Sequence, residues 1–289
     1  MADHHAHAPD VSLAGLVADG LLDAELAALA WALACGGVGI LVAGPGGTGP
    51  GGTRPDGANG ARGPVVGPGD GSSLAAALAD AVALTTRVVH LGAGSAAEPV
   101  EEAVGEAGGG VLVLTAHDLG GSGEGALRRA AARAAVRAVS DRTGIALVAT
   151  IRAADLEGVL GRLRGLTVAA PDDEIERLGV VMVLGASEDG RPRVVAAHYL
   201  RAPAVGPLGR VERRGPAVLA TFDAGRGAWD HFGWGIVPEL ADRVAVSPAD
   251  LEAAVTVRRE TIEALVAHGL RGVAPFRAAA NLALPAPRA

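Results

Sequence analysis

The chain has 289 residues, a net charge of −7 and one cysteine, Cys35. This length suffices for one large domain or two small ones, and the acidic balance excludes the basic surface that nucleic-acid binding requires. A single cysteine excludes a disulfide framework and a cysteine-based zinc cluster. No apolar run is long enough without charges to span a membrane. We therefore expect a cytoplasmic protein with no metal site and no membrane insertion.

The first part of the chain alternates helices with apolar strands. Residues 1–10 form a polar tail that we expect to be disordered, and residues 11–170 form an α/β core with a flexible Gly/Pro-rich insertion at 50–71. The predicted elements are helices at 22–33, 73–84, 98–104, 125–140 and 154–163, and strands at 38–43, 87–91, 111–115 and 145–151. This alternation indicates a mainly parallel sheet with helices on both faces.

The pattern changes after Pro171. Residues 171–245 form a β-rich section with predicted hairpins at 180–200, around Asp189-Gly190, and at 216–232. Residues 246–289 form C-terminal helices, of which the first begins at the Ser247 cap followed by proline and ends at Gly269. The last helix is predicted at 274–284.

A glycine-rich loop follows the strand at 38–43, where a P-loop would cradle phosphates with its backbone N–H groups. The lysine of such a loop is missing, because all 25 basic residues of the chain are arginine. The same glycines also fit Gly-x-Gly-x-x-Gly, the dinucleotide-binding pattern, although that pattern leads directly into a helix and Pro50 prevents one here. The third interpretation of the loop is a flexible turn that binds nothing. The candidate nucleotide-binding residues of this loop are Gly44, Gly46, Gly47, Thr48 and Gly49.

A second stretch resembles the end of a P-loop with its lysine deleted. Ser72 and Ser73 follow glycines and lead directly into a predicted helix. One interpretation is a single P-loop split by the insertion, with its hydroxyl-bearing end at these serines. The other interpretation is an ordinary helix N-cap.

Several stretches together resemble the secretion ATPases, the RecA-like motors of type II and type IV secretion and pilus assembly. They are residues 21–44 (LLDAELAALAWALACGGVGILVAG), 110–118 (GVLVLTAHD), 149–160 (ATIRAADLEGVL), 179–200 and 217–240. The resemblance implies a RecA-like P-loop NTPase core, ATP with Mg²⁺ as cofactor, a homohexamer and partners in a secretion or pilus assembly.

The diagnostic motifs of this family are eroded. Pro50 stands where family members carry the P-loop lysine, and His90 ends the second strand where they carry acids. Their Walker B strand ends in a catalytic glutamate, for which only Asp118 could substitute here. Their histidine box has a histidine where this chain has Arg152, which would either contact a phosphate or pair with a nearby carboxylate.

We therefore predict a degenerate P-loop NTPase-like protein that binds ATP and Mg²⁺ weakly or not at all and acts as a structural or regulatory component. The alternatives are an active ATP-hydrolysing motor that uses unusual residues, a dinucleotide-binding protein and a scaffold that binds no nucleotide. The arginines at 129, 133 and 137 share one helical face and indicate a solvated surface, or else a subunit contact or arginine finger. Trp234 lies in an aromatic cluster for which we expect a packing role rather than a partner surface.

Overall fold

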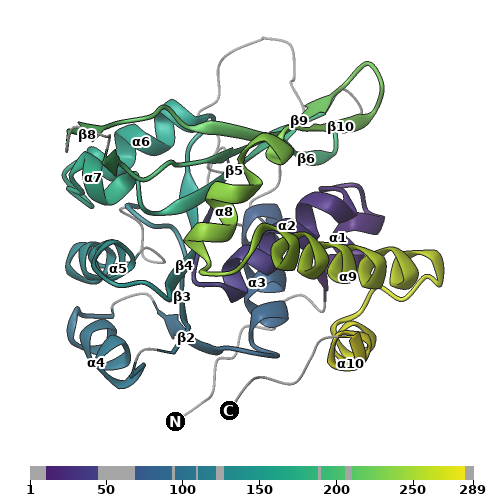
Figure 1. Ribbon diagram of the computed structural model, residues 1–289, viewed down its shortest axis with the longest axis horizontal. Helices are drawn as coiled ribbons and strands as arrows, with labels where there is room; N and C mark the ends of the chain where they lie inside the picture. The colour runs from purple at the N-terminus through teal and green to yellow at the C-terminus, as the bar shows by residue number, and fades with distance from the viewer. Residues whose placement is uncertain are drawn as a thin grey trace, which may run out of the picture.

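The computed structural model describes residues 11–44, 69–92, 95–108, 110–121, 127–187, 190–205 and 210–283. Within these ranges the chain builds one eight-stranded sheet in the order β10-β9-β6-β5-β1-β4-β3-β2 (Figure 1). Its strands are β1 (Gly39–Gly44), β2 (Arg87–Leu91), β3 (Leu112–Ala116), β4 (Ile145–Arg152), β5 (Gly179–Ala186), β6 (Pro192–Tyr199), β9 (Ala217–Asp223) and β10 (Ala228–His231). Strands β7 (Ala204–Val205) and β8 (Val211–Glu212) pair separately as a short ribbon.

Five neighbouring strands, β2, β3, β4, β1 and β5, run parallel. Strand β1 lies between β4 and β5, with Leu41 opposite Ala149 on one side and Val181 on the other. Because helices cover both faces, the central strands are apolar at almost every position. The prediction of an α/β protein with a mainly parallel central sheet is confirmed. Strand β5, predicted within the β-rich section, belongs to this parallel set.

The antiparallel section continues the same sheet beyond β5. Strand β6 pairs antiparallel with β5 and β9, and β9 pairs antiparallel with β10. The turn between β9 and β10 is closed by a hydrogen bond from the amide of Gly227 to the carbonyl of Asp223, with Gly227 at a φ of 64°. At the β5–β6 connection, Gly190 has a φ of 79°, whereas Asp189 lies outside the described residues. Both predicted hairpin pairings are confirmed.

Helices form a layer on each face of the sheet (Figure 1). One layer holds α4 (Glu98–Glu106), α5 (Arg129–Asp141), α6 (Leu156–Arg164) and α7 (Asp172–Ile175). The other holds α1 (Leu13–Ala18), α2 (Ala24–Cys35), α3 (Gly69–Val82), α8 (Val237–Arg243), α9 (Pro248–Ala267) and α10 (Val273–Ala283), and the 3₁₀ turn η1 (Gly233–Ile236) precedes α8. The predicted C-terminal helices are α9 and α10.

The core consists of two apolar clusters, one on each face of the sheet. Ile40 and Val42 of β1 pack into the cluster that contains α2 and α3, whereas Leu41 packs into the cluster that contains α5 and α6. This division follows from the alternation of side chains along a strand. Trp31 is fully buried in the first cluster, where its ring centroid lies 5.2 Å from that of Phe276.

The start of α3 corrects one boundary. The sequence places residues 69–71 in the flexible insertion, but they form the first turn of α3, four residues before the predicted helix start. A Cβ at Gly71 would lie 3.4 Å from Leu184 and 3.6 Å from Val42, so this glycine-rich turn lies close against the sheet. Residues 45–68 of the loop and insertion lie outside the described residues, as do residues 1–10.

Two short helices, α1 and α8, were not predicted. Helix α1 has only six residues, too few to show a helical period, and its N-cap is Ser12, whose hydroxyl accepts a hydrogen bond from Gly15 N. No helix among the described residues combines the length and the apolar character needed to cross a membrane.

Candidate functional site

The candidate site lies where the carboxyl ends of the parallel strands meet at a change in the direction of winding. From β1 the chain passes through α3 to the far edge strand β2, then returns through β3 and β4 to the neighbour of β1. Helix α3 lies on one face of the sheet, whereas α4 and α5 lie on the other. In open α/β sheets, ligands bind in the crevice at such a switch point.

The topology brings several predicted site residues to this edge. Gly44 ends β1 and is paired with Arg152 at the end of β4, and the amide of Ala153 donates to the Gly44 carbonyl at 3.0 Å. Asp118 follows the end of β3. Ser72 lies in the first turn of α3, and the half-buried Ser73 follows it.

Asp118 is held by its backbone in an unusual conformation. Its φ is +52°, in the left-handed region that aspartate tolerates better than most residues. Its amide donates to Thr150 Oγ1 at 2.8 Å, and the next amide, of Leu119, donates to the Thr150 carbonyl at 2.7 Å. Thr150 of β4 therefore fixes the turn that follows β3.

The side chain of Asp118 forms an ion pair with Arg152. The Asp118 Oδ2 atom lies 3.0 Å from Arg152 Nε, and the side chains are 5% and 52% exposed, respectively. Neither carboxylate oxygen has a well-aligned hydrogen-bond donor among the described residues. The ion pair with Arg152 and the lack of an aligned hydrogen bond are consistent, because an electrostatic contact at 3.0 Å does not require the N–H to point at the oxygen. Arg152 thus offsets the charge of a buried carboxylate that would otherwise be costly to desolvate.

A histidine links this turn to α3. The Nδ1 atom of His117 lies 3.3 Å from Ser72 Oγ and 3.2 Å from Thr150 Oγ1. The Ser72 hydroxyl is therefore directed towards an imidazole, while the neighbouring carboxylate is directed towards Arg152. The sequence interpretation did not include His117 in the site. Its position directly after β3 was the available signal.

A cavity of about 410 Å³ opens beside these residues, between α3 and the ends of β2 and β3. Its polar lining consists of Ser72, Asp80, His90, Thr115 and His117, and its apolar wall comes from α3 and from strands β2 to β4. His90 Nδ1 lies 2.7 Å from Thr115 Oγ1, as expected from their pairing across β2 and β3. The Nδ1 atoms of His90 and His117 therefore each contact a hydroxyl group. Five polar side chains, the carboxylate of Asp80 among them, therefore line one cavity.

The glycine loop itself lies outside the described residues. This applies to Gly46, Gly47, Thr48 and Gly49, and also to Pro50. The flanking residues are placed: Gly44 ends β1, and Gly71 lies beside Val42 and Thr150. Both ends of the segment that resembles a split P-loop therefore lie at the carboxyl edge of β1 and β4.

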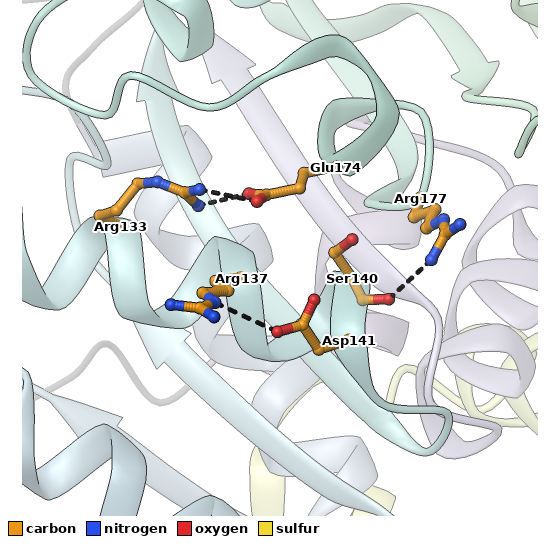
Figure 2. Close-up of polar contacts among 6 residues, drawn as sticks. All are labelled: Arg133, Arg137, Ser140, Asp141, Glu174 and Arg177. Atoms are coloured by element: carbon orange, nitrogen blue, oxygen red, sulfur yellow. Dashed lines mark hydrogen bonds and ion pairs between the residues drawn. The ribbon is translucent and has the colours of Figure 1, made fainter.

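The arginine row of α5 is not a uniformly solvated face. Figure 2 shows Arg133 in a two-pronged interaction with Glu174 of α7, with 2.6 Å between Arg133 Nη2 and Glu174 Oε1. Hydrogen bonding to Glu174 raises the pKa of Arg133. The exposed Arg137 pairs within α5, 3.2 Å from Asp141 Oδ2, and Arg177 donates to the Ser140 carbonyl (Figure 2). Arg133 therefore joins two helices of one layer.

No family model and no curated protein matches the chain. The resemblance to the secretion ATPases therefore depends on the motifs quoted from the sequence. Within the described ranges, no three His, Cys, Asp or Glu side chains gather in an arrangement that could hold a metal ion.

Proposed function

We propose that this chain is a degenerate RecA-like P-loop NTPase related to the secretion and pilus-assembly ATPases, which does not hydrolyse ATP and serves as a structural or regulatory component. One observation carries this proposal: the buried carboxylate of Asp118 is paired with Arg152. Asp118 is the acid available at the end of β3 for positioning water. Arg152 stands at the position where the family resemblance places a histidine.

Hydrolysis requires charge neutralisation at the γ-phosphate and a positioned nucleophile. The chain has no lysine, and Pro50, at the lysine position, also lacks the backbone N–H that would face a phosphate. The donor set does not fit Mg²⁺ either. Asp118 faces a guanidinium and Ser72 faces an imidazole, so a cation would have to displace both interactions.

The strand order supports a P-loop interpretation over a dinucleotide one. In the dinucleotide fold the first strand lies between the second and the fourth. Here β1 lies between β4 and β5, and β2 is the far edge strand. Strand β2 also ends at His90 and Leu91, without the acid that would bind a ribose. Residual phosphate binding would come from main-chain amides, the Ser72 hydroxyl and the half-exposed Arg152.

Calorimetric titration of the full chain with ATP and Mg²⁺, together with a phosphate-release assay, tests the proposal. We expect no turnover and weak or absent binding. A Gly71→Lys variant places a lysine directly before Ser72, and Pro50→Lys with Gly51→Ser rebuilds the front of the loop. One of these variants should raise the affinity for ATP, whereas Gly161→Lys, which adds the same charge on the exposed surface of α6, should not.

Two outcomes would overturn the proposal. Wild-type turnover of about one per second, abolished by Asp118→Ala, would show an active motor. An unchanged affinity in both rebuilt variants would show that neither glycine stretch is a phosphate cradle and would favour the scaffold alternative.

A further inference from the structure

A second cavity lies in the same helical layer as α3 but at other elements, where η1 and β10 meet α2, α8 and α9. It measures about 360 Å³, and we call it the Trp234 groove. Its floor is apolar and its rim is charged. Its lining includes Leu29, Trp234, Val237, Glu252, Val255 and Arg259.

Trp234 is exposed to an unusual degree for this chain. Only seven of the 289 residues are aromatic, and Trp31, Tyr199 and Phe276 are each at most 2% exposed. Trp234 is 80% exposed and the nearby Phe232 is 45% exposed, so the expected packing role is wrong for Trp234. Exposed tryptophan beside an apolar depression is typical of a protein interaction site, where tryptophan often contributes most to binding.

The described residues around the groove leave the carboxylate of Glu252 without a partner. His231 contacts Asp23, with 2.6 Å between Nε2 and Oδ2, and its Nδ1 lies 3.8 Å from Glu25 Oε1. The cation of the rim, Arg259, lies 3.9 Å from Glu263 on its own helix. Glu252 is exposed on α9 and has no ion-pair or hydrogen-bond partner in the part of the chain that the structure describes. The groove therefore offers an indole face and a free carboxylate.

We propose that the Trp234 groove binds an arginine side chain presented by a partner protein. A guanidinium prefers the face of a tryptophan ring, and its fork of N–H donors matches a carboxylate such as Glu252. The aliphatic stem of the arginine packs on Leu29, Val237 and Val255, because long cationic side chains bury their methylene groups on apolar surface. The partner is thus a protein segment with an exposed arginine flanked by apolar residues. This site is independent of any nucleotide at the carboxyl edge.

A peptide titration tests this inference on the full chain. The probe is a capped pentapeptide, Ala-Leu-Arg-Leu-Ala, and its control carries citrulline, the neutral isostere, in place of arginine. The indole N–H resonance of Trp234 reports on binding, and Trp31, which is fully buried, provides an internal reference. We expect the arginine peptide to shift the Trp234 signal and to bind about tenfold more tightly than the citrulline peptide.

Three variants locate the interaction. Trp234→Ala and Glu252→Gln should each weaken binding of the arginine peptide, and neither should unfold the chain because both side chains are exposed. Glu260→Gln changes an exposed glutamate of the same helix that does not line the groove, and it should bind like the wild type. Three results would each overturn the proposal: equal affinity for the arginine and citrulline peptides, no shift of the Trp234 resonance at millimolar peptide, or an equal loss of affinity in Glu252→Gln and Glu260→Gln.

Discussion

The pairing of Asp118 with Arg152 predicts an unequal response to removal of either partner. In Arg152→Gln the carboxylate of Asp118, which is 95% buried in the wild type, loses its cationic partner, and neither of its oxygens is hydrogen-bonded by the described residues. In Asp118→Asn the remaining guanidinium is about half exposed and stays hydrated. Asparagine also tolerates the positive φ at this position. The arginine variant should therefore be the less stable of the two.

The magnitude follows from the exposure of the two groups. Removing one partner of a fully buried pair costs about 3–5 kcal/mol, whereas an exposed pair contributes about 0–1 kcal/mol. Because Arg152 is half exposed, we expect Arg152→Gln to reduce the free energy of unfolding by about 1–3 kcal/mol, between those limits. Asp118→Asn should cost about 0–1 kcal/mol, since it removes a charge that lacks directional hydrogen bonds.

Urea unfolding followed by circular dichroism measures these differences, and the double variant should resemble Asp118→Asn because no buried charge remains. Arg137→Gln is the matched control. Arg137 pairs with Asp141 on the exposed surface of α5, so its loss should change stability by less than about 0.5 kcal/mol. If Asp118→Asn costs as much as Arg152→Gln, Asp118 contributes through an interaction other than this ion pair, and our account of the site is wrong.

Three further predictions concern the fold. The hydrogen bond to Asp23 raises the pKa of His231 above 6.5 in the folded state, so folding favours the protonated imidazole. The stability that His231 adds relative to His231→Gln should therefore be complete below pH 6.5 and should fall as the pH rises above it. A difference in stability that stays constant between pH 5 and 9 would contradict this. Trp31→Phe removes a buried indole N–H that donates at 3.1 Å to the carbonyl of Ala81 in α3, and it should lower the free energy of unfolding in urea by about 1–3 kcal/mol. An unchanged free energy of unfolding would contradict a stabilising role for this hydrogen bond. Gly179→Ala introduces a Cβ at a φ of +112° that would collide with β1, and it should lower the free energy of unfolding, measured by thermal unfolding, by about 2–4 kcal/mol. Its control is Gly161→Ala on the open surface of α6, which should leave the stability unchanged or raise it.

The candidate site was only partly predictable from the sequence. The positions of Asp118 and Arg152 at strand ends followed from the family resemblance and the apolar runs before them. Their ion pair was one of two interpretations left open for Arg152, and only the structure shows it. His117 was missed because the sequence gives no indication that Ser72, 45 residues earlier, and Thr150, 33 residues later, meet at its Nδ1 atom.

The sequence by itself determined the type and approximate limits of most elements. Apolar runs predicted the strands, and the cap at Ser247 with Gly269 beyond the helix end predicted α9, because these signals act within a few residues of each other. Only the tertiary structure decided the order of the strands, the place of β5 beside β1 and the exposure of Trp234. The physical reason is that the spacing of apolar residues indicates which positions of an element are buried. It does not record which distant segment buries them, and that choice depends on the packing of the whole chain.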